Sequence, residues 1–589
     1  MSTDSFPNLI SQRLQAAVKA VCDEASLPEG FTVDVVPATN PQFGDYQSNA
    51  ALQLSKSLRQ SPRDVAARLS EAFDAGDLCD PPTVAGPGFI NFRLSASVLA
   101  GRTAALLGDD RLGVPRTEHP KTIVIDFSAP NIAKPMHVGH IRSTILGDCL
   151  TRTARFLGHT VVTDNHIGDW GTQFGMVLWA WKNLRDDAAL AADPVGELLR
   201  LYRVVNDQQK SDDNLRDTCK AELVKLQQGD TENLEIWRQC VSLSRGGLER
   251  IYEQLDITFD HWLGESAYNG ALAPLVDRLL AEGIATASDG AICIFSDGRG
   301  DPKSDPFLIF RDDAWQANPF LIRKSDGGFL YATTDLATVD HRLREFHADA
   351  LWYVVGAPQQ SHFDQLFAVC RRRGITAELE FISFGSILGK DRKMLRTRSG
   401  ETVQLADVLS EARERALKVI EEKNPGLDDD EKTDIARAIG IGSVKYAELS
   451  QHRMTDYVFD WDTMLSLKGN TAPYLINAYV RTRSIFRRLG TDFQSCGELV
   501  LTEPTERALA LKLLQYGETV PGILTGFRPN LLCSYLFELA SAYHGFFEEC
   551  PVLRSEGAIR ESRLALCELT GRVLRHGLGL LGIQPVERM

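Results

Sequence analysis

Thr122-Ile-Val-Ile-Asp126 is a short apolar run typical of a buried strand, and residues 141–157 have the length and patterning of a helix. Pro130-Asn-Ile-Ala-Lys-Pro-Met-His-Val-Gly-His140 lies between them. Gly158 ends the predicted helix, and residues 159–163 read as the next strand. The unit is therefore β-loop-α-β, which predicts an open α/β sheet. Ligands of such sheets bind beyond the carboxyl ends of the strands, and a helix N-terminus offers free N–H groups to phosphate.

The His-Val-Gly-His tetrad at this junction suits phosphate chemistry. Gly139 has no Cβ, so a base or a ribose can approach the main chain closely. His137 and His140 can donate hydrogen bonds to phosphate oxygens that gain charge during a reaction. By itself the tetrad is equally compatible with an ordinary turn that has one solvent-facing and one capping histidine. The flanking strand and helix favour the nucleotide site.

Length and composition limit the class of protein. The chain has 589 residues, too many for one core, so we expect roughly three to five domains. With 43% apolar and 24% charged residues, the composition is that of a soluble globular protein. We expect a cytoplasmic location without membrane contact, because the chain contains no run of about 20 apolar residues and no signal-peptide start. The 11 cysteines are scattered without a Cys-x-x-Cys pair, which predicts neither disulfides nor a metal site.

The net charge of −15 contrasts with the basic footprint usual in RNA-binding proteins. Basic clusters do occur, and each by itself also fits a solvated face. The Tyr474 and Tyr479 side chains favour RNA binding at the last cluster, because aromatic rings can stack on unpaired bases. The clusters are Arg371-Arg-Arg373, Lys390-Asp-Arg-Lys393 with Arg396 and Arg398, and Arg481, Arg483, Arg487 and Arg488.

The chain resembles the class I aminoacyl-tRNA synthetases, whose first signature is His-x-Gly-His at this junction of a Rossmann-like domain. Its closest resemblance is to arginyl-tRNA synthetases of the bacterial type. Three motifs carry that resemblance, and it extends over essentially the whole chain. They are Asp126-Phe-Ser-Ala-Pro-Asn-Ile-Ala-Lys-Pro-Met-His-Val-Gly-His140, Asn165-His-Ile-Gly-Asp-Trp-Gly-Thr-Gln173 and the C-terminal Val586-Glu-Arg-Met589.

The resemblance implies an α/β fold class with a Rossmann-like catalytic domain that carries a helical insertion. It also implies a small N-terminal α/β domain that contacts tRNA and a C-terminal α-helical anticodon-binding bundle. The corresponding ranges are 1–107 for the N-terminal domain, 120–399 for the catalytic domain with its insertion at about 183–300, 400–467 for a helical connecting segment, and 468–589 for the bundle.

By the same resemblance the chain is expected to be an arginine–tRNA ligase. The carboxylate of L-arginine attacks the α-phosphorus of ATP, and pyrophosphate leaves with Mg²⁺. The terminal 2′-hydroxyl of tRNA(Arg) then attacks the arginyl-adenylate. Arginyl-tRNA synthetases typically need tRNA before they activate the amino acid. We expect a monomer, with ATP and Mg²⁺ as cofactors.

Two carboxylates are candidates to bind the arginine side chain, because a guanidinium presents five donors in a planar fork. Asp126 and Asp335 resemble the guanidinium-side residues of the family, and Tyr331 resembles the ring that packs beside the substrate. Asn131 and Gln359 resemble the residues that hold its amino and carboxylate groups. Either aspartate alone also fits a helix N-cap or a strand-end solvent group.

The resemblance also implies the ATP site and the catalytic residues. The ATP-binding set is His137, Gly139, His140, His166, Gly168 and Asp169, with Lys134 beside it. The second signature, Gly389-Lys-Asp-Arg-Lys-Met-Leu-Arg-Thr-Arg398, is degenerate, and Lys134 is expected to supply the missing charge. The catalytic set is therefore Lys134, His137, His140, Lys390, Lys393 and Arg398. The whole first signature comprises Pro130, Asn131, Ile132, Ala133, Lys134, Pro135, Met136, His137, Val138, Gly139 and His140.

In the C-terminal region the expected tRNA contacts are Asn470, Tyr474, Tyr479, Arg483 and Met589. Gly577-Leu-Gly-Leu-Leu-Gly582 satisfies a dinucleotide-binding pattern, but it ends a helical run and no strand precedes it. We interpret it as a closely packed helix terminus.

Two other functions remain open from the residues alone. The first is another nucleotidyl-transfer enzyme, either a small transferase or a synthetase for a different amino acid. A small transferase would not need the long helical C-terminal region, and an apolar substrate would leave Asp126 and Asp335 buried without a cation. The second is a non-catalytic tRNA-binding relative, which would be expected to have lost the loop motifs.

Overall fold

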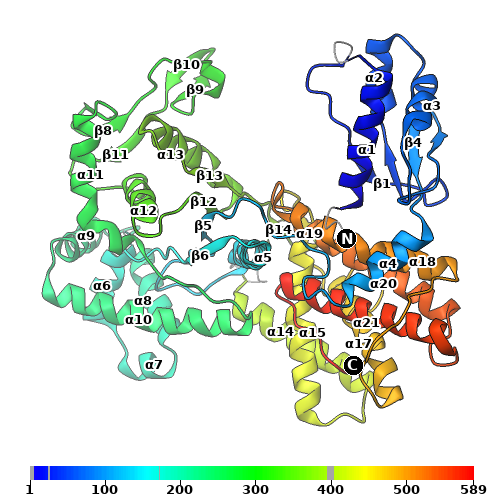
Figure 1. Cartoon of the computed structure of the whole chain (residues 1–589). Helices are drawn as coiled ribbons and strands as arrows, with labels where there is room; N and C mark the ends of the chain where they lie inside the picture. The colour runs from blue at the N-terminus through cyan, green and yellow to red at the C-terminus, as the bar shows by residue number, and fades with distance from the viewer. Residues whose placement is uncertain (1–4, 24–26, 172, 394, 396–402) are drawn as a thin grey trace.

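A computed structural model describes residues 5–23, 27–171, 173–393, 395 and 403–589. The catalytic sheet lies near the centre of the molecule (Figure 1). The insertions extend to one side of this sheet, and the helical C-terminal bundle lies on the other side. The N-terminal module stands on the bundle, away from the insertions.

The N-terminal module is a four-stranded antiparallel sheet covered by helices. Its strand order is β1-β2-β4-β3. Serine side chains cap three of its helices, which fixes where they begin: Ser5 precedes α1, Ser61 precedes α3 and Ser95 precedes α4. The elements are α1 (Phe6–Val21), β1 (Val35–Pro37), β2 (Tyr46–Ser48), α2 (Ala50–Leu58), α3 (Pro62–Ala72), β3 (Thr83–Ala85), β4 (Phe89–Phe92) and α4 (Ala96–Leu106).

The catalytic sheet is parallel, with strand order β13-β12-β5-β6. Its strands are β5 (Thr122–Asp126), β6 (Thr160–Asp164), β12 (Ala350–Tyr353) and β13 (Glu378–Phe381). Ile123 and Ile125 pack in one core with α5 (Ile141–Leu157), whereas Val124 packs in a second core with α12 (Tyr331–Glu345) and α13 (Gln360–Arg372). Both faces are therefore covered, and the chain reverses its winding between β5 and β12. That switch point is where α/β sheets bind ligands.

The insertion between β6 and α12 is only partly helical. Five helices come first: α6 (Gln173–Leu184), α7 (Asp187–Ala192), α8 (Pro194–Gln208), α9 (Asp213–Gln227) and α10 (Thr231–Gln254). The short helix η3 (Glu265–Tyr268) and α11 (Asn269–Ala281) follow, then the strands β7 (Thr286–Ser288), β8 (Ala291–Ile294), β9 (Leu308–Arg311), β10 (Ala314–Ala317) and β11 (Phe320–Arg323), with η4 (Pro302–Ser304) between β8 and β9. Strands β7 and β8 lie inside the range for which the sequence predicted helix.

The C-terminal half is mainly helical. It comprises η5 (Ala357–Gln359) before α13, β14 (Ile387–Leu388), α14 (Leu405–Lys423), α15 (Asp429–Leu449), β15 (Tyr457–Val458), α16 (Trp461–Met464), α17 (Ala472–Leu489), α18 (Pro504–Leu514), α19 (Tyr516–Leu524), α20 (Asn530–Glu549) and α21 (Gly557–Leu580). Gly577 lies inside α21, where an added Cβ would be 2.6 Å from the Leu536 side chain. The glycine-rich pattern is thus a packed helix terminus.

The N-terminal module docks on the bundle through buried polar contacts. Arg507 of α18 donates two hydrogen bonds to the carboxylate of Asp45, at 2.8 and 2.6 Å. The Tyr46 hydroxyl donates to Glu518 of α19 at 2.9 Å, and burial raises the pKa of Glu518 to about 7. Among the described helices of the chain, none is long and apolar enough to cross a membrane.

Candidate active site

The loop after β5 has a strained backbone. Ser128, Ala129 and Ala133 all have positive φ, at 74°, 45° and 61°. Neighbouring side chains hold this conformation: the Ser128 N–H donates to Ser143 Oγ at 2.8 Å, and the Ala129 N–H donates to Asn165 Oδ1 at 3.2 Å. Non-glycine residues persist in this region only when their surroundings impose it, and such positions concentrate at functional sites.

Asn131 and Gly168 join two of the predicted motifs. The Ile132 N–H donates to the Gly168 carbonyl, and the Gly168 N–H donates to the Pro130 carbonyl, each at 3.1 Å. A Cβ at Gly168 would lie 2.3 Å from the Asn131 side-chain oxygen. Only glycine therefore fits beside Asn131, and the pairing brings the segment 165–169 against the first signature.

His137 and His140 cap the short helix η2 (Val138–His140). The His137 N–H donates to Nδ1 of His140 at 3.1 Å, and the Gly139 N–H donates to Nδ1 of His137 at 3.1 Å. Burial lowers the pKa of His140 to about 4 and also lowers the pKa of His137, to which Lys134 contributes. Burial therefore favours the neutral form of both rings. Nδ1 of His137 accepts the Gly139 N–H, which leaves the proton of that ring on Nε2. Nδ1 of His140 lies near both the N–H and the carbonyl of His137. A neutral imidazole has one N–H group, a hydrogen-bond donor suited to phosphate oxygens.

Lys134 lies beside these histidines on the same loop. Its Nζ is 4.3 Å from the ring centroid of Tyr202 on α8, within the range of a cation–π contact. The side chain also borders a cavity of about 320 Å³ between the loop and helices α8 and α10. An ammonium group is thus held near the predicted phosphate position.

Asp335 lies on the first turns of α12 in a cluster with Tyr331 and His362. Asp335 Oδ2 is 2.6 Å from His362 Nε2. The Tyr331 and His362 rings are 4.8 Å apart, and the Tyr331 residue is 61% exposed. Gln359 is exposed in η5, just before the helix that carries His362. Tyr331, Asp335 and His362 therefore form one cluster, the acidic cluster, which is partly exposed to solvent.

Glu265 was not predicted from the sequence, although its carboxyl interacts electrostatically with Asp335 of the acidic cluster. It is the first residue of η3, and burial raises the pKa of its carboxyl, to which Asp335 and Asp169 also contribute. The Asp169 carboxylate accepts hydrogen bonds from Ser266 N–H at 2.9 Å and Ser266 Oγ at 2.7 Å. Asp169 therefore holds the turn that presents Glu265, rather than pointing freely at a nucleotide. Within this insertion loop Glu265 had no motif that could have revealed it.

The structure corrects the expectation for Asp126. Arg342 of α12 is fully buried, and its Nη2 donates to Asp126 Oδ2 at 2.7 Å and to Asp164 Oδ2 at 2.8 Å. Burial raises the pKa of Asp126, and Arg342 opposes that rise. The Asp126 carboxylate already pairs with a guanidinium of the chain itself, which argues against a direct contact with a substrate guanidinium. Two adjacent strands that both end in aspartate were the available signal, because buried carboxylates need a cation.

His166 links the acidic cluster to the first signature. Its Nδ1 is 3.0 Å from the Leu263 carbonyl, and its ring centroid is 5.7 Å from that of Tyr268. The carboxyls of Asp126, Asp169 and Glu265 all interact electrostatically with this imidazole. His166 precedes Gly168, which pairs with the first signature, by two residues. The acidic cluster and the histidine loop therefore lie at the same end of the parallel sheet.

The described part of the second signature, residues 389–393 and 395, directly follows β14, which pairs with β15. Lys390 Nζ is 2.8 Å from Asp460 Oδ1, and the lysine side chain is 74% exposed. The Gly389 N–H donates to the Lys393 carbonyl at 2.8 Å, which closes a turn with both lysines exposed. Residues Arg396 and Arg398 lie outside the described residues. The described residues resume at Val403, whose carbonyl accepts a hydrogen bond from the Val138 N–H at 2.9 Å.

The predicted tRNA contacts need one clear correction. Tyr479 is 2% exposed, and its hydroxyl donates to Glu587 at 2.6 Å, so its ring cannot stack on a base. The Arg483 guanidinium pairs with Glu568 at 2.9 Å. Tyr474 is half-buried and its hydroxyl is 2.8 Å from His544 Nδ1. The side chain of Asn470, an exposed residue, accepts from Tyr446 at 2.5 Å.

Met589 and the arginine cluster 371–373 also contact the chain itself. Met589 borders a small cavity beside Ile420 and Ile439. Arg372 donates to the Phe295 carbonyl at 2.6 Å, and Arg373 donates to Asp340 at 2.7 Å. These two arginines hold the insertion and helix α12 together, so the cluster is not simply a solvated face.

Three family models match successive parts of the chain. Residues 102–461 match the family model "tRNA synthetases class I (R), catalytic domain". Residues 8–94 match "Arginyl tRNA synthetase N terminal domain", and residues 475–589 match "DALR anticodon binding domain". The parallel sheet, the histidine loop beyond β5 and the first of these matches define a class I aminoacyl-tRNA synthetase.

Whole-chain relatives are more specific. Two proteins named arginine–tRNA ligase, from Thermobifida fusca and Chromobacterium violaceum, are 45% and 43% identical over 588 and 586 residues, covering 99% of each chain. The chain belongs to the arginine–tRNA ligase family. The crystal structure of arginyl-tRNA synthetase from Plasmodium falciparum superposes with a TM-score of 0.82 at 26% identity and covers all of both chains. The Thermus thermophilus enzyme has the same TM-score at 24% identity and shows the shared fold.

Proposed function

We propose that the region between the histidine loop and α12 is where this arginine–tRNA ligase activates its amino acid. Arginine, ATP and tRNA are the substrates of such a ligase. The observation that carries the assignment is the pair of histidines at η2 together with two acidic side chains that interact with each other, Asp335 and Glu265. A guanidinium needs that acidic environment, and a triphosphate needs those donors.

In this proposal Asp335 and Glu265 bind the guanidinium, and Tyr331 packs against the substrate side chain. Asn131 and Gln359 hold its α-amino and carboxylate groups. Asp126 contributes indirectly, because its pairing with Arg342 fixes α12 against the sheet and so places Asp335. Two partly buried carboxylates also disfavour an apolar amino acid as the substrate, because it would leave them without a counter-charge.

The nucleotide lies over η2 in this proposal. His137 and His140 donate from Nε2 to phosphate oxygens, and Gly139 leaves room for the adenosine. Lys134 neutralises charge on the leaving pyrophosphate, assisted by Lys390 and Lys393 from the second signature. Such a reaction depends on in-line placement and on charge stabilisation, not on an enzyme nucleophile. In this proposal Gly168 holds the loop that carries Asn131, Asp169 holds the turn that carries Glu265, and His166 lies between the two.

Mg²⁺ belongs to the proposal as a companion of ATP. Among the described residues no three His, Cys, Asp or Glu side chains are grouped so that they could hold a metal. Mg²⁺ commonly binds through substrate phosphates and water rather than through a protein cage. We therefore assign it no protein ligands and no separate step.

The domain division of the sequence analysis is retained in this proposal, and the enzyme is proposed to act as a monomer. Residues 1–107 and 468–589 would contact tRNA, with Asn470 and Tyr474 the remaining candidates among the predicted side chains. Arg483 and Met589 would contribute only if they leave their present contacts.

The test is ATP–pyrophosphate exchange with each of the standard amino acids, with and without tRNA. We expect exchange with arginine alone, and only when tRNA(Arg) is present. Charging of tRNA(Arg) with labelled arginine should accompany it. Exchange with a different amino acid, or none with arginine in the presence of tRNA(Arg), would refute the proposal.

A further inference from the structure

Arg142 connects the first signature helix to a distant part of the chain. It lies two residues after His140, and its side chain is only 4% exposed. Its Nε is 3.2 Å from Glu448 Oε2, and its Nη1 donates to the Thr455 carbonyl at 3.0 Å, 313 residues further along the chain. Its guanidinium carbon is 5.4 Å from the ring centroid of Tyr457. One side chain thus contacts the end of α15, the following loop and β15.

Glu448 is the second half of this junction. It is the last residue but one of α15, its side chain is 2% exposed, and its Oε1 accepts a hydrogen bond from the Tyr457 hydroxyl. Burial raises the pKa of Glu448 to about 7, and Arg142 opposes that rise. Within the described part of the chain, Glu448 Oε2 has no hydrogen-bond partner. Buried ion pairs with incomplete hydrogen bonding contribute little to stability compared with apolar residues of similar shape. Stability alone therefore does not account for the cluster.

The segment that follows α15 holds the strand leading to the second signature. The Gly385 N–H donates to the Arg453 carbonyl at 2.8 Å, and the Ser386 N–H donates to Asp456 Oδ1 at 2.5 Å. A Cβ at Gly385 would lie 2.9 Å from the Met454 carbonyl oxygen, so the two segments touch backbone to backbone.

The contact continues into the signature itself. Ile387 and Leu388 pair in parallel with Tyr457 and Val458. Beyond the pair, Lys390 Nζ meets Asp460 Oδ1 at 2.8 Å. The position of the second signature is therefore set by residues 453–460, which Arg142 ties to the helix that begins after His140.

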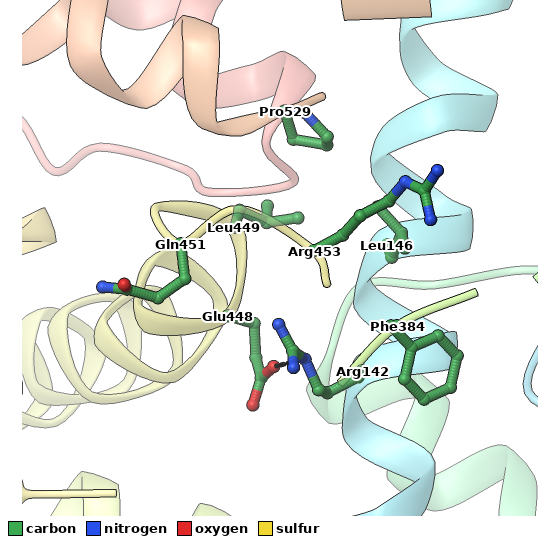
Figure 2. A pocket seen from close by; sticks show the side chains of 8 residues that line it. All are labelled: Arg142, Leu146, Phe384, Glu448, Leu449, Gln451, Arg453 and Pro529. Atoms are coloured by element: carbon green, nitrogen blue, oxygen red, sulfur yellow. Dashed lines mark ion pairs between the residues drawn. The ribbon is translucent and has the colours of Figure 1, made fainter. Parts of the chain in front are cut away.

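Figure 2 shows Arg142 on α5 and Glu448 on α15 directed at each other across this junction. The hollow beside them has a volume of about 10 Å³, room for no more than one water molecule. Pro529, just before α20 of the bundle, borders the same hollow. A close-packed interior transmits displacement instead of absorbing it, so a shift of α15 would move the second signature.

We propose that Arg142, Glu448 and Tyr457 are positioning residues for amino-acid activation: they set the place of Gly389–Lys393, the first part of the second signature, relative to His137 and His140. The inference rests on the proposed function, because it concerns the same reaction. Helix α15 packs between α5 and the bundle helix α17. In this proposal it fixes the position of the two signatures relative to each other. None of the three side chains is proposed to touch a substrate.

A second buried charge on α15 supplies a matched control. Lys445 donates to the Gly582 carbonyl, beyond α21, at 2.7 Å, and its ammonium interacts electrostatically with Asp148 of α5. Among the described residues no contact links Lys445 to residues 453–460. Lys445→Met therefore removes a buried charge of α15 without loosening the segment beside the second signature.

The test compares full-length variants in ATP–pyrophosphate exchange with arginine and tRNA(Arg), at a temperature well below their unfolding. Glu448→Gln is expected to lower kcat about 10-fold to 100-fold and to leave KM for arginine and Kd for tRNA within about two-fold. Lys445→Met is expected to retain wild-type kcat. In a Lys390→Ala background, Glu448→Gln should lower kcat by less than about two-fold further, because the group that it positions is gone.

Three results would overturn the proposal: wild-type kcat in Glu448→Gln, an equal loss in Lys445→Met, or full additivity with Lys390→Ala. If Glu448→Gln does not fold, Tyr457→Phe is measured instead, and it is expected to lower kcat while KM for arginine and Kd for tRNA change little. Failure of the wild-type chain to exchange pyrophosphate with arginine would refute the proposed function instead, so the two failures are distinguishable.

Discussion

Asp126 and Asp335 can be separated experimentally, because the structure gives each carboxylate a different partner. Asp335→Asn keeps the shape of a side chain whose Oδ2 lies 2.6 Å from His362 Nε2. It removes the charge from what we propose are charge-assisted hydrogen bonds to the arginine guanidinium. Such bonds contribute roughly 1.5–3 kcal/mol. A loss of about 3 kcal/mol corresponds to a Kd for arginine raised roughly 100-fold, with little change in stability.

Asp126→Asn should behave in the opposite way. It leaves the buried Arg342 guanidinium with only Asp164 as a full counter-charge, and breaking a buried pair costs about 3–5 kcal/mol. Because asparagine retains one acceptor oxygen, we expect about 3 kcal/mol, which lowers the thermal midpoint of the catalytic domain by about 6–12 °C. Arginine affinity measured well below that midpoint should change less than about three-fold.

The assays are calorimetric titration with arginine and differential scanning calorimetry of the same samples. Glu345→Gln, at the exposed end of the helix that carries Asp335, is the control and should change neither quantity. Wild-type arginine affinity in Asp335→Asn would refute its role. Lost affinity with unchanged stability in Asp126→Asn would restore Asp126 as the direct ligand.

Three further predictions concern the histidine loop and the bundle. His140→Ala removes one Nε2–H donor and should slow single-turnover adenylate formation about 100-fold to 1,000-fold with tRNA affinity unchanged; an unaltered rate would count against the phosphate assignment. Lys134→Ala should reduce kcat of pyrophosphate exchange at least about 10-fold while KM for arginine stays within two-fold, and the reverse pattern would place this lysine at the amino acid. Burial lowers the pKa of His576 to about 4, whereas in the unfolded chain this imidazole binds its proton near pH 6.5. The free energy of unfolding is therefore fully present above about pH 6.5 and falls by about 3 kcal/mol as the pH drops to about 4. His576→Gln should flatten that part of the pH profile of the thermal midpoint, and an unchanged profile would show that this imidazole does not report the transition.

The sequence predicted the β5-loop-α5-β6 unit well because its signals are local. The strand, the loop and the helix follow one another within residues 122–164, and Gly158 marks the helix end with a left-handed φ of 102°. The contact between Asn131 and Gly168 likewise joins two motifs that the sequence had already singled out. Short-range patterns of this kind need no knowledge of tertiary packing.

The parts that the sequence missed depend on distant partners. Asp126 and Arg342 are separated by 216 residues, so nothing beside Asp126 shows that its charge is already paired. Tyr479 is different, because its burial was readable. Leu475, Tyr479, Thr482 and Phe486 recur at helical spacing and are all buried, so the tyrosine belongs to the apolar stripe of α17 rather than to an RNA-binding face.

The docking of the N-terminal module on α18 has a consequence for synthesis of the chain. Asp45 and its partner Arg507 are 462 residues apart. At translation rates of about 5–20 residues per second, the module leaves the ribosome roughly 20–90 s before the surface that receives it exists. During that interval the nascent module must keep the face around Asp45 and Tyr46 soluble without its eventual cover. The polar groups of Asp45 and Tyr46 at this interface suit a module that stays uncovered during synthesis, because exposed carboxylate and hydroxyl groups do not promote aggregation as an apolar patch would.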